Sequence, residues 1–386
     1  MPMPAAKPVN PILTARIRKS FPSAERAFSL DVDFSAAPGF TILFGPSGSG
    51  KTTLLDCIAG LTTPDAGRIA EGKRVLFHAT APDANAKANI SVAKRGVGYV
   101  LQDLALFPHL TVEKNTEYGL AHLPRASRKQ RAVAALQDFH IEHLRQHRPA
   151  QISGGERQRV ALARSLVTDP CVLLLDEPLA ALDAATKTKI LDDLRRWNQA
   201  HRIPILYVTH SREEVFALGE RVLVLEDGRI IAQGSPHEVL RAPLLETVAQ
   251  LAGFENIFDT TVESIHEDRG TMLCRITTLM PGDEASSVLL ETPLIRAEAG
   301  SPLRIGIRAG DILLAIAKPV GLSARNVIPG KLRSIERRDM IISVRVDCGV
   351  EVEVYLTLAA RDALQLEAGR EVWLVIKTHS CHLMQK

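Results

Sequence analysis

The sequence predicts an α/β domain with a parallel β-sheet, followed by a smaller β-rich domain. Short apolar runs typical of buried parallel strands, such as residues 39–44 and 172–175, alternate with helical segments in the first part of the chain. A glycine-rich turn joins one of these runs to a helical pattern. Beyond about residue 245 the chain changes to short β-type runs broken by Gly, Pro and Asp. The 386 residues allow two or three domains.

The composition is that of an ordinary globular protein and excludes several classes of protein. Hydrophobic residues make up 46% and charged residues 24%, which excludes a mainly disordered, collagenous or coiled-coil chain. The formal net charge of +3 is too small to indicate a nucleic-acid partner, and 4% aromatic residues argue against base-stacking surfaces. We therefore expect no nucleic-acid partner.

The cysteines and the N-terminus predict a cytosolic protein. The five cysteines are far apart and form no CxxC pair, which is typical of reduced thiols. Residues 1–11 carry four prolines and no apolar core of a secretory signal, so they predict a flexible leader. No apolar run approaches the ~20 residues that a membrane span requires. Any membrane role is therefore expected to come through a partner.

The first domain is predicted as a series of alternating strands and helices. Strand-like segments precede the buried run 39–44, which leads through the glycine-rich turn to a helix over 52–61. Residues 62–95 contain Pro-Asp-Ala-Gly and a polar stretch, which predicts turns and an exposed meander. The pattern then predicts a strand at 96–101, helices over 112–148 and 159–167, strands at 172–175 and 205–209, and a hairpin at 222–231.

The C-terminal part contains two similar segments. Residues 298–308 and 367–377 both begin with Glu-Ala-Gly, continue with alternating aliphatic residues and end in a basic residue. A remote internal duplication and a chance repeat of a turn-then-strand pattern explain this equally well. Further β-type runs at 306–307, 341–346, 350–356 and 371–376 predict a small β domain or a pair of them.

The glycine-rich turn, residues 45–52, has the sequence GPSGSGKT and matches the phosphate-loop pattern GxxxxGK[ST]. A strand before it and a helix after it are the context in which backbone amides and the helix dipole bind phosphates. Lys51 is expected to reach the β- and γ-phosphates, and the Thr52 hydroxyl to ligate Mg²⁺. The predicted nucleotide-binding residues are Gly45, Pro46, Ser47, Gly48, Ser49, Gly50, Lys51, Thr52 and Thr53.

Two carboxylates follow the buried run 172–175, where ligands of open α/β sheets bind. Asp176 suits the coordination shell of Mg²⁺, and Glu177 is expected to polarise the attacking water.

A second candidate anion site is the start of the helix after Ile152. Ser153 is a good N-cap, and Gly154 and Gly155 allow a phosphate to approach the backbone ahead of Glu156. Because one phosphate loop already holds one end of a nucleotide, this second site would have to close over it from elsewhere.

The order of these segments resembles the ATP-binding subunits of ABC transporters over residues 12–240. The most specific element is the signature segment, residues 152–158 (ISGGERQ), in which Ile152 stands where Leu is commoner. The resemblance implies a P-loop ATPase domain with a helical subdomain, ATP and Mg²⁺ as cofactors, and a homodimer. ATP would lie between Lys51 of one copy and the signature residues Ser153, Gly154, Gly155 and Glu156 of the other.

The resemblance also assigns roles to single residues. Gln102 is similar to the loop glutamine that senses Mg²⁺ and links the site to the membrane partner, so it is counted with both the catalytic and the metal-binding residues. Asp183 resembles the aspartate that couples the two halves of the dimer, and His210 the switch histidine that contacts the γ-phosphate. Phe21 is where such proteins often stack an aromatic ring on adenine, with Phe28 as the competitor.

The docking segment, residues 106–112, resembles the part of importer-type subunits that meets the transmembrane partner. The resemblance therefore implies transmembrane permease subunits, and through them a periplasmic or extracellular oxyanion-binding protein. The chain would then act at the cytoplasmic face of the cell membrane.

Residues 321–386 resemble the small OB-like Mop-type β domain of the TOBE group, which is associated with molybdate and tungstate. Hydrogen-bond donors and positive charge suit an oxyanion. The alternative interpretation is a Ser-x-x-Asn turn that only shapes the corner of a barrel. The predicted oxyanion residues are Ser323, Ala324, Arg325, Asn326 and Lys377.

Together these patterns predict the ATP-hydrolysing subunit of a molybdate importer, with residues 241–320 as a linker and β-rich segment. The alternatives are an importer ATPase for sulfate, ferric iron or a polyol, a soluble ABC ATPase of translation or DNA repair, and a regulatory oxyanion-binding protein. The soluble enzymes generally carry two fused nucleotide-binding halves or a long coiled-coil insertion, and this chain has one phosphate loop.

Overall fold

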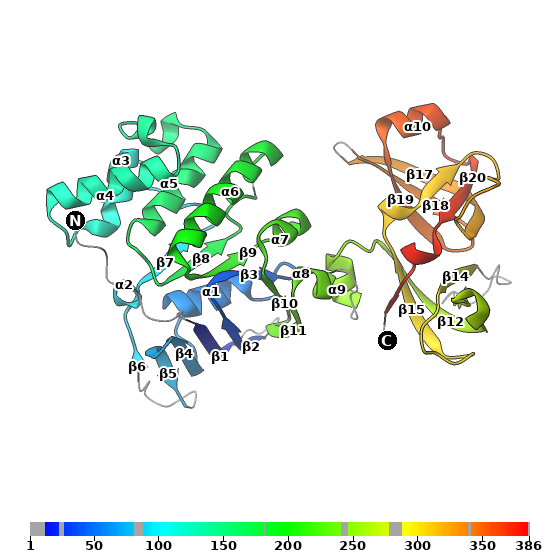
Figure 1. Cartoon of the computed structure of the whole chain (residues 1–386), viewed down its shortest axis with the longest axis horizontal. Helices are drawn as coiled ribbons and strands as arrows, with labels where there is room; N and C mark the ends of the chain where they lie inside the picture. The colour runs from blue at the N-terminus through cyan, green and yellow to red at the C-terminus, as the bar shows by residue number, and fades with distance from the viewer. Residues whose placement is uncertain are drawn as a thin grey trace. The chain divides into compact units, whose positions relative to one another are not determined.

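The computed structural model describes residues 12–22, 27–80, 88–180, 182–240, 246–277, 288–338 and 341–384. The chain forms two compact units, Met1–Val239 and Leu240–Lys386 (Figure 1). The predicted leader, residues 1–11, lies outside the described residues. The domain boundaries expected at 240/241 and 320/321 stay predictions from sequence.

Unit 1 is built on a six-stranded sheet of order β11-β10-β3-β9-β8-β7. All neighbouring strands are parallel except β10 and β11, which form the predicted hairpin. The described chain turns there through Asp227 and Gly228, both with positive φ (42° and 76°), as in tight hairpin turns. The strands are β3 (Gly39–Phe44), β7 (Val97–Val100), β8 (Val172–Asp176), β9 (Pro204–Val208), β10 (Arg221–Glu226) and β11 (Arg229–Gly234).

A second, antiparallel sheet of order β2-β1-β4-β5-β6 corrects one prediction. The segment 62–95, predicted as turns and an exposed meander, contains three strands of this sheet, and its apolar residues Ile69, Leu76 and Phe77 are fully buried. The strands are β1 (Leu13–Phe21), β2 (Phe28–Ala36), β4 (Ala66–Glu71), β5 (Arg74–Ala79) and β6 (Ala88–Asn89).

Helices cover the parallel sheet and form a separate helical subdomain. Helix α1 packs between the two sheets, where Leu54 and Ile58 share one core with residues of β1 and β8 (Figure 1). The segment 112–148 is helical, as predicted, but interrupted. The helices of the unit are α1 (Lys51–Ala59), α2 (Val92–Arg95), α3 (Val112–Glu117), α4 (Arg125–Asp138), α5 (Gly154–Leu166), α6 (Ala184–His201), α7 (Arg212–Leu218) and α8 (Pro236–Leu240), with 3₁₀ turns at Tyr118–Leu120, Glu142–Leu144 and Pro149–Gln151.

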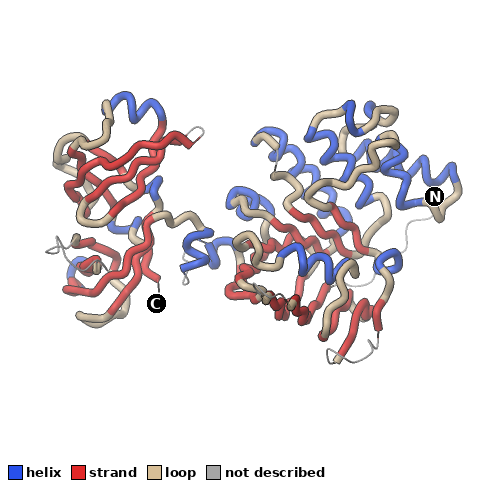
Figure 2. The backbone as a smooth tube through the Cα atoms, turned by 180° about the vertical axis from the view of Figure 1, so that it is seen from behind, coloured by secondary structure: helices blue, strands red, loops and turns tan. Residues whose placement is uncertain are grey.

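Unit 2 contains two five-stranded antiparallel sheets that follow the same plan (Figure 2). Their orders are β14-β13-β12-β15-β21 and β19-β18-β17-β20-β16, so each strand of one sheet has a counterpart in the other. The elements are α9 (Glu246–Leu251), β12 (Asn256–His266), β13 (Thr271–Ile276), β14 (Leu289–Pro293), β15 (Pro302–Ile307), β16 (Leu313–Ala315), β17 (Asn326–Arg338), β18 (Ile341–Asp347), β19 (Glu351–Thr357), α10 (Leu358–Leu364), β20 (Glu371–Ile376) and β21 (His382–Met384), with 3₁₀ turns at Glu267–Arg269, Ala309–Asp311 and Thr378–Ser380.

The two sheets of unit 2 exchange their last strands. Strand β16, which follows β15 in sequence, pairs with β20, whereas β21, which follows β20, pairs with β15. The similar segments 298–308 and 367–377 contain β15 and β20, so they occupy equivalent places, which supports an internal duplication. A single hydrophobic core contains residues of both sheets, for example Ile305 and Leu374. Residues 321–386 therefore do not have a core of their own.

Equivalent asparagines join the two sheets of unit 2. Asn256 begins β12, and its side-chain amide exchanges two hydrogen bonds with the backbone of Glu353 in β19, at 2.7 and 2.8 Å. Asn326 begins β17 and makes the same pair of bonds with the backbone of Glu291 in β14, at 2.6 and 2.9 Å. Both asparagines are 4% exposed. Each buried amide thus satisfies two backbone groups of the opposite sheet.

Candidate nucleotide site

The phosphate loop leaves β3 and leads into α1, as predicted. Gly50 precedes the helix with φ of +99°, a conformation that favours glycine, and a Cβ there would lie 2.6 Å from the Phe28 ring. The Lys51 side chain is 8% exposed, and its Nζ donates to the carbonyls of Gly45 (3.0 Å) and Pro46 (2.8 Å). Burial lowers the pKa of Lys51, opposed by the charges of Glu177 and Asp176. The ammonium is held inside the loop, where phosphate oxygens would replace its carbonyl partners.

Asp176 and Thr52 meet at the end of β8. The Thr52 hydroxyl donates to Asp176 Oδ2 at 2.8 Å, and Asp176 is 5% exposed. Burial raises the pKa of Asp176, the hydrogen bond from Thr52 lowers it, and the neighbouring charge of Glu177 raises it further. A buried carboxylate beside a hydroxyl is a donor set that suits Mg²⁺.

The rest of the metal's coordination would come from elsewhere. Among the described residues there is no cluster of three or more His, Cys, Asp or Glu residues able to hold a metal ion. A magnesium ion held at Thr52 and Asp176 would therefore need phosphate oxygens and water for most of its ligands.

Glu177 and His210 form a pair at the ends of neighbouring strands β8 and β9. The Nδ1 atom of His210 lies 3.3 Å from Glu177 Oε2, and the His210 side chain is largely exposed. Glu177 has a left-handed φ of 44°, which is unfavourable for a residue with a side chain, and its backbone N–H donates to the carbonyl of Val208 at 3.1 Å. Two of the three residues predicted to be catalytic, Glu177 and His210, are therefore in contact.

A pocket of about 400 Å³ collects most of the predicted nucleotide residues and is called here the nucleotide pocket. Gln102, which was predicted to belong to the site although it lies 50 residues after the phosphate loop, lines this pocket together with Asp176 and Glu177. Of the two aromatic residues considered for stacking on adenine, Phe28 lines the pocket and Phe21 is not among the lining residues. The Phe28 ring lies beside Gly50 of the phosphate loop. Phe21 is 38% exposed and its ring centroid lies 6.2 Å from that of Phe28. The lining residues are Phe28, Ser47, Gly48, Gly50, Lys51, Thr52, Thr53, Gln102, Asp176 and Glu177.

The signature residues line a different pocket, of about 600 Å³. Ser153 caps α5, because its Oγ accepts from the Glu156 N–H at 3.3 Å. In return, the Ser153 hydroxyl and backbone N–H both donate to the Glu156 carboxylate, at 2.8 and 2.7 Å. These hydrogen bonds lower the pKa of Glu156. Asp183 caps α6 by accepting from the Thr186 N–H at 2.9 Å and lines the same pocket, together with Gly154 and Gly155.

The docking segment is organised by Asn115, a residue that the sequence analysis missed. Asn115 lies on α3 and is fully buried. Its Oδ1 accepts from the Phe107 N–H at 2.8 Å, and its Nδ2 donates to the carbonyls of Phe107 and Thr111, both at 3.1 Å. An amide residue among the buried positions of a short helix was the available signal, because such a group needs polar partners.

The predicted oxyanion residues separate into two groups. Ser323, Arg325 and Lys377 are exposed, and Arg325 and Lys377 are the chain neighbours of Asn326 and Ile376, the last paired residues of β17 and β20. Arg325 also lies 3.8 Å from the Glu291 carboxylate. The prediction that Asn326 binds the oxyanion is wrong. Its amide is buried, and its oxygen and nitrogen are both hydrogen-bonded to the backbone of Glu291, so it links the two sheets.

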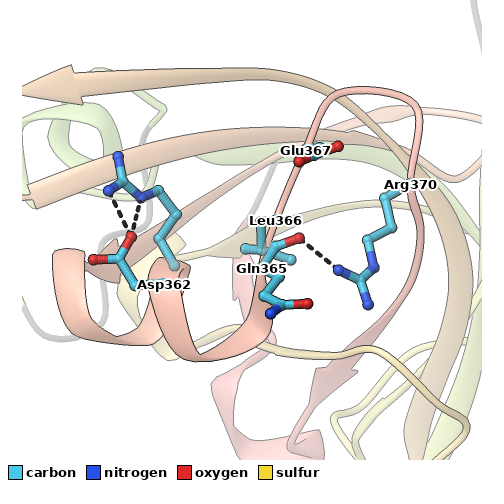
Figure 3. Close-up of a pocket in the computed structure, with 6 residues that line it drawn as sticks. Asp362, Gln365, Leu366, Glu367 and Arg370 are labelled. Carbon is cyan, nitrogen blue, oxygen red and sulfur yellow. Dashed lines mark hydrogen bonds and ion pairs between the residues drawn. The ribbon is translucent and has the colours of Figure 1, made fainter.

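Ala324, which has no polar side-chain atom, is half-buried. A pocket of unit 2 lies elsewhere, at α10 and the turn that follows it (Figure 3). Its arginines are already engaged: Arg361 pairs with Asp362, and Arg370 donates to the carbonyl of Leu364 at 3.0 Å. It contains none of the predicted oxyanion residues.

Comparison with known proteins adds the family. The family model of ABC transporters matches residues 30–180, and the model of TOBE domains matches residues 322–383. The chain is similar to the molybdenum import ATP-binding protein of Rhizobium meliloti (strain 1021), with 40% identity over 354 residues, covering 91% of this chain and 95% of that protein. The protein of the same name from Vibrio cholerae serotype O1 is 33% identical over 355 residues, covering 90% and 92%.

Solved structures of ABC cassettes resemble unit 1. A dimeric structure of the cassette MJ0796 in a post-hydrolysis state bound to ADP and phosphate gives a TM-score of 0.50 at 28% identity. A second dimeric structure of MJ0796, described as a bacterial ABC transporter cassette, gives 0.51, and each covers 58% of this chain and 98% of its own. Among the described residues, no helix is long and apolar enough to cross a membrane. With a relative 40% identical over nearly its whole length, this chain belongs to the family of ABC transporter ATP-binding proteins, among the molybdenum import ATP-binding proteins.

Proposed function

We propose that this chain is the ATP-hydrolysing subunit of an importer of molybdate. The observation that carries the proposal is the nucleotide pocket, where the phosphate loop, Asp176, Glu177 and Gln102 meet. The relatives' names favour molybdate over sulfate, ferric iron or a polyol, and they favour transport over a soluble ATPase of translation or DNA repair.

The phosphate loop and α1 bind the nucleotide's phosphates. Backbone N–H groups at the start of α1 and the Lys51 ammonium face the anion, and the helix dipole adds to their attraction. Magnesium, when bound, would be held by Thr52 and Asp176 and would neutralise charge on the phosphate oxygens. Phe28 is the aromatic side chain on the pocket wall that can pack against the rest of the nucleotide.

Glu177 and His210 act on the attacking water. The Glu177 carboxylate accepts a hydrogen bond from the water and orients it toward the γ-phosphate. His210, 3.3 Å from that carboxylate, holds its orientation and offers a ring nitrogen at the side of the transferred phosphoryl group. The left-handed backbone of Glu177 is part of this arrangement, because strained residues persist where surrounding contacts determine them.

Two copies of the chain complete two sites. The nucleotide pocket and the signature pocket have no lining residue in common, so Ser153 of one copy would close over the nucleotide held by Lys51 of another. The dimeric state of the MJ0796 cassettes supports this arrangement.

The docking segment would bind transmembrane permease subunits, with Gln102 as the link to the nucleotide pocket. We place the chain at the cytoplasmic face of the cell membrane, where a periplasmic or extracellular oxyanion-binding protein delivers substrate through the permease. No nucleic-acid partner is part of this proposal.

ATP-dependent uptake tests the proposal directly. Proteoliposomes that contain the chain and its permease, supplied with the oxyanion-binding protein, are expected to accumulate molybdate when ATP is inside and not when Lys51→Ala replaces the wild type. Sulfate, ferric iron and a polyol are measured in parallel. Preferred uptake of one of these would show that it, and not molybdate, is the substrate. ATP hydrolysis without uptake of any of them would reject the proposed importer function.

Unit 2 is also proposed to bind the oxyanion, at Ser323, Arg325 and Lys377. Arg325 and Lys377 come directly before and after the last paired residues of β17 and β20, Asn326 and Ile376, so two positive charges lie at one end of these strands. Arg325 lies 3.8 Å from the Glu291 carboxylate, so an anion bound there would have to compete with Glu291 for the guanidinium.

Calorimetry of the full chain is expected to show binding of molybdate or tungstate in preference to phosphate. Phosphate near pH 7 is a mixture of a monoanion and a dianion that both carry at least one donor hydroxyl, whereas molybdate only accepts hydrogen bonds, so a site built of donors favours molybdate. Arg325→Ala is expected to weaken binding by about tenfold, the effect of one charge-assisted hydrogen bond. Arg345→Ala is the control, because it removes an exposed arginine that pairs with Glu351 on the same unit. Equal or absent binding of molybdate, sulfate and phosphate would leave unit 2 a structural and dimer-forming part.

A further inference from the structure

Helix α5 joins the signature segment to the loop that follows Gln102. The helix begins at the Ser153 cap and carries Arg164 in its last turn. The Arg164 guanidinium donates to the carbonyls of Leu104 at 2.7 Å and Ala105 at 2.6 Å. One end of the helix therefore presents the signature residues, and the other holds the chain two residues beyond Gln102.

The residues that Arg164 holds have an uncommon backbone. Leu104 and Ala105 have φ values of 61° and 41°, in the left-handed region that residues with a side chain disfavour. Two hydrogen bonds from a charged donor stabilise such a conformation. The guanidinium carbon also lies 5.6 Å from the centroid of the Phe107 ring, at the start of the docking segment. A single side chain thus links the chain just after Gln102 to the docking segment, through Leu104, Ala105 and Phe107.

The docking segment has a separate support. Its shape is set by Asn115 on α3, through the bonds to Phe107 and Thr111 described above. Removing Arg164 would therefore leave the Asn115 bonds in place while releasing Leu104 and Ala105 from α5. The two functions, keeping the segment's shape and tying it to the signature helix, fall on different side chains.

We propose that Arg164 is a positioning residue that makes the loop between Gln102 and Phe107 move together with the signature helix, so that closure on ATP is transmitted to the permease. The proposal rests on the function proposed above. A displacement of Ser153 at one end of a rigid helix is carried to Arg164 at the other, and two hydrogen bonds pass it to the loop.

The test is the ratio of molybdate transported to ATP hydrolysed, in proteoliposomes of the assembled importer. Arg164→Ala is expected to lower this ratio about tenfold. The KM for ATP is expected to stay within about threefold, because the nucleotide pocket does not include Arg164. Co-purification with the permease is expected to persist, because Asn115 still shapes the docking segment.

Two further variants separate positioning from general stability. Arg131→Ala is the matched control: Arg131 on α4 donates to the carbonyl of Val167 at 3.0 Å, at the same end of α5, but makes no contact with the loop in the described structure. Its ratio should equal that of the wild type. Arg164→Lys keeps the charge but lacks the planar fork that reaches two carbonyls, so it should also lower the ratio.

The outcomes distinguish this inference from the proposed function. A wild-type importer that transports no molybdate would reject the function, whatever the variants do. Wild-type transport together with an unchanged ratio in Arg164→Ala and Arg164→Lys would overturn the role of Arg164. If Arg164→Ala does not fold, the result for Arg164→Lys decides the question. A wild-type ratio of transport to hydrolysis in Arg164→Lys would show that the positive charge alone is needed, and it would reject the link through two carbonyls.

Discussion

Replacing Glu177 with glutamine is expected to preserve ATP binding and to reduce turnover by about 10²–10⁴-fold, the usual range for losing a general base. The amide keeps the shape of the side chain and its contact with His210, but it cannot attract the proton of the attacking water. Lys51, Thr52 and Asp176, which hold the phosphates and the metal, are unchanged. The measurement is steady-state ATP hydrolysis beside equilibrium binding of labelled ATP.

The same variant should accumulate in the closed, ATP-bound dimer, because hydrolysis no longer releases it. Size-exclusion chromatography is expected to show a dimer that forms with ATP and dissociates when ATP is removed. Glu213→Gln is the control: Glu213 is an exposed carboxylate in the first turn of α7, close in sequence to His210. Near wild-type hydrolysis by Glu177→Gln would remove Glu177 from its assigned role.

Mixing two inactive variants is expected to restore hydrolysis. Lys51→Ala removes the ammonium group that faces the phosphates, and Ser153→Arg fills the signature pocket with a bulky cation. Each pure homodimer should therefore be inactive. In a mixed dimer, one interface carries both lesions and the other joins an intact Lys51 to an intact Ser153. Random mixing in equal amounts should recover up to about a quarter of the wild-type rate, since half of the dimers are mixed and each has one intact site.

This experiment depends on the separation of the two pockets within one chain. If ATP were bound and hydrolysed by the Lys51 and Ser153 of a single copy, every subunit in the mixture would stay defective and no activity would return. Each variant mixed with itself, at the same total concentration, is the baseline. Melting temperatures equal to that of the wild type would show that both variants fold.

The local patterns determined the elements of unit 1 and the residues of its site. Strand β3 spans the predicted residues 39–44, and the turn after it is followed by α1 as the phosphate-loop motif requires. The carboxylates Asp176 and Glu177 end β8 beside that loop. These predictions succeeded because each depends on a short run of chain whose hydrophobic period, glycines and caps fix its conformation locally.

The antiparallel strands of residues 66–89 and the link at Asn326 were decided by the tertiary structure. Strands β4 to β6 are short and flanked by turn residues. Strand β4 pairs with β1 at a distance in sequence, and β5 and β6 add to the sheet from β4, so their stability depends on that pairing. The Asn326 amide could donate a hydrogen bond to an anion, but both its nitrogen and its oxygen are hydrogen-bonded to the backbone of Glu291, 35 residues away in sequence. Whether a polar side chain is free depends on which distant groups reach it.

The sequence by itself determined the fold class, the family and most of the nucleotide-binding residues, because these are written in contiguous motifs. Only the tertiary structure decided that Phe28, rather than Phe21, lines the nucleotide pocket, that β16 and β21 exchange between the sheets of unit 2, and that Arg164 holds the loop after Gln102. Each of these facts is a contact between residues well separated along the chain. Their formation depends on the packing of whole sheets and helices, which no local pattern of residues encodes.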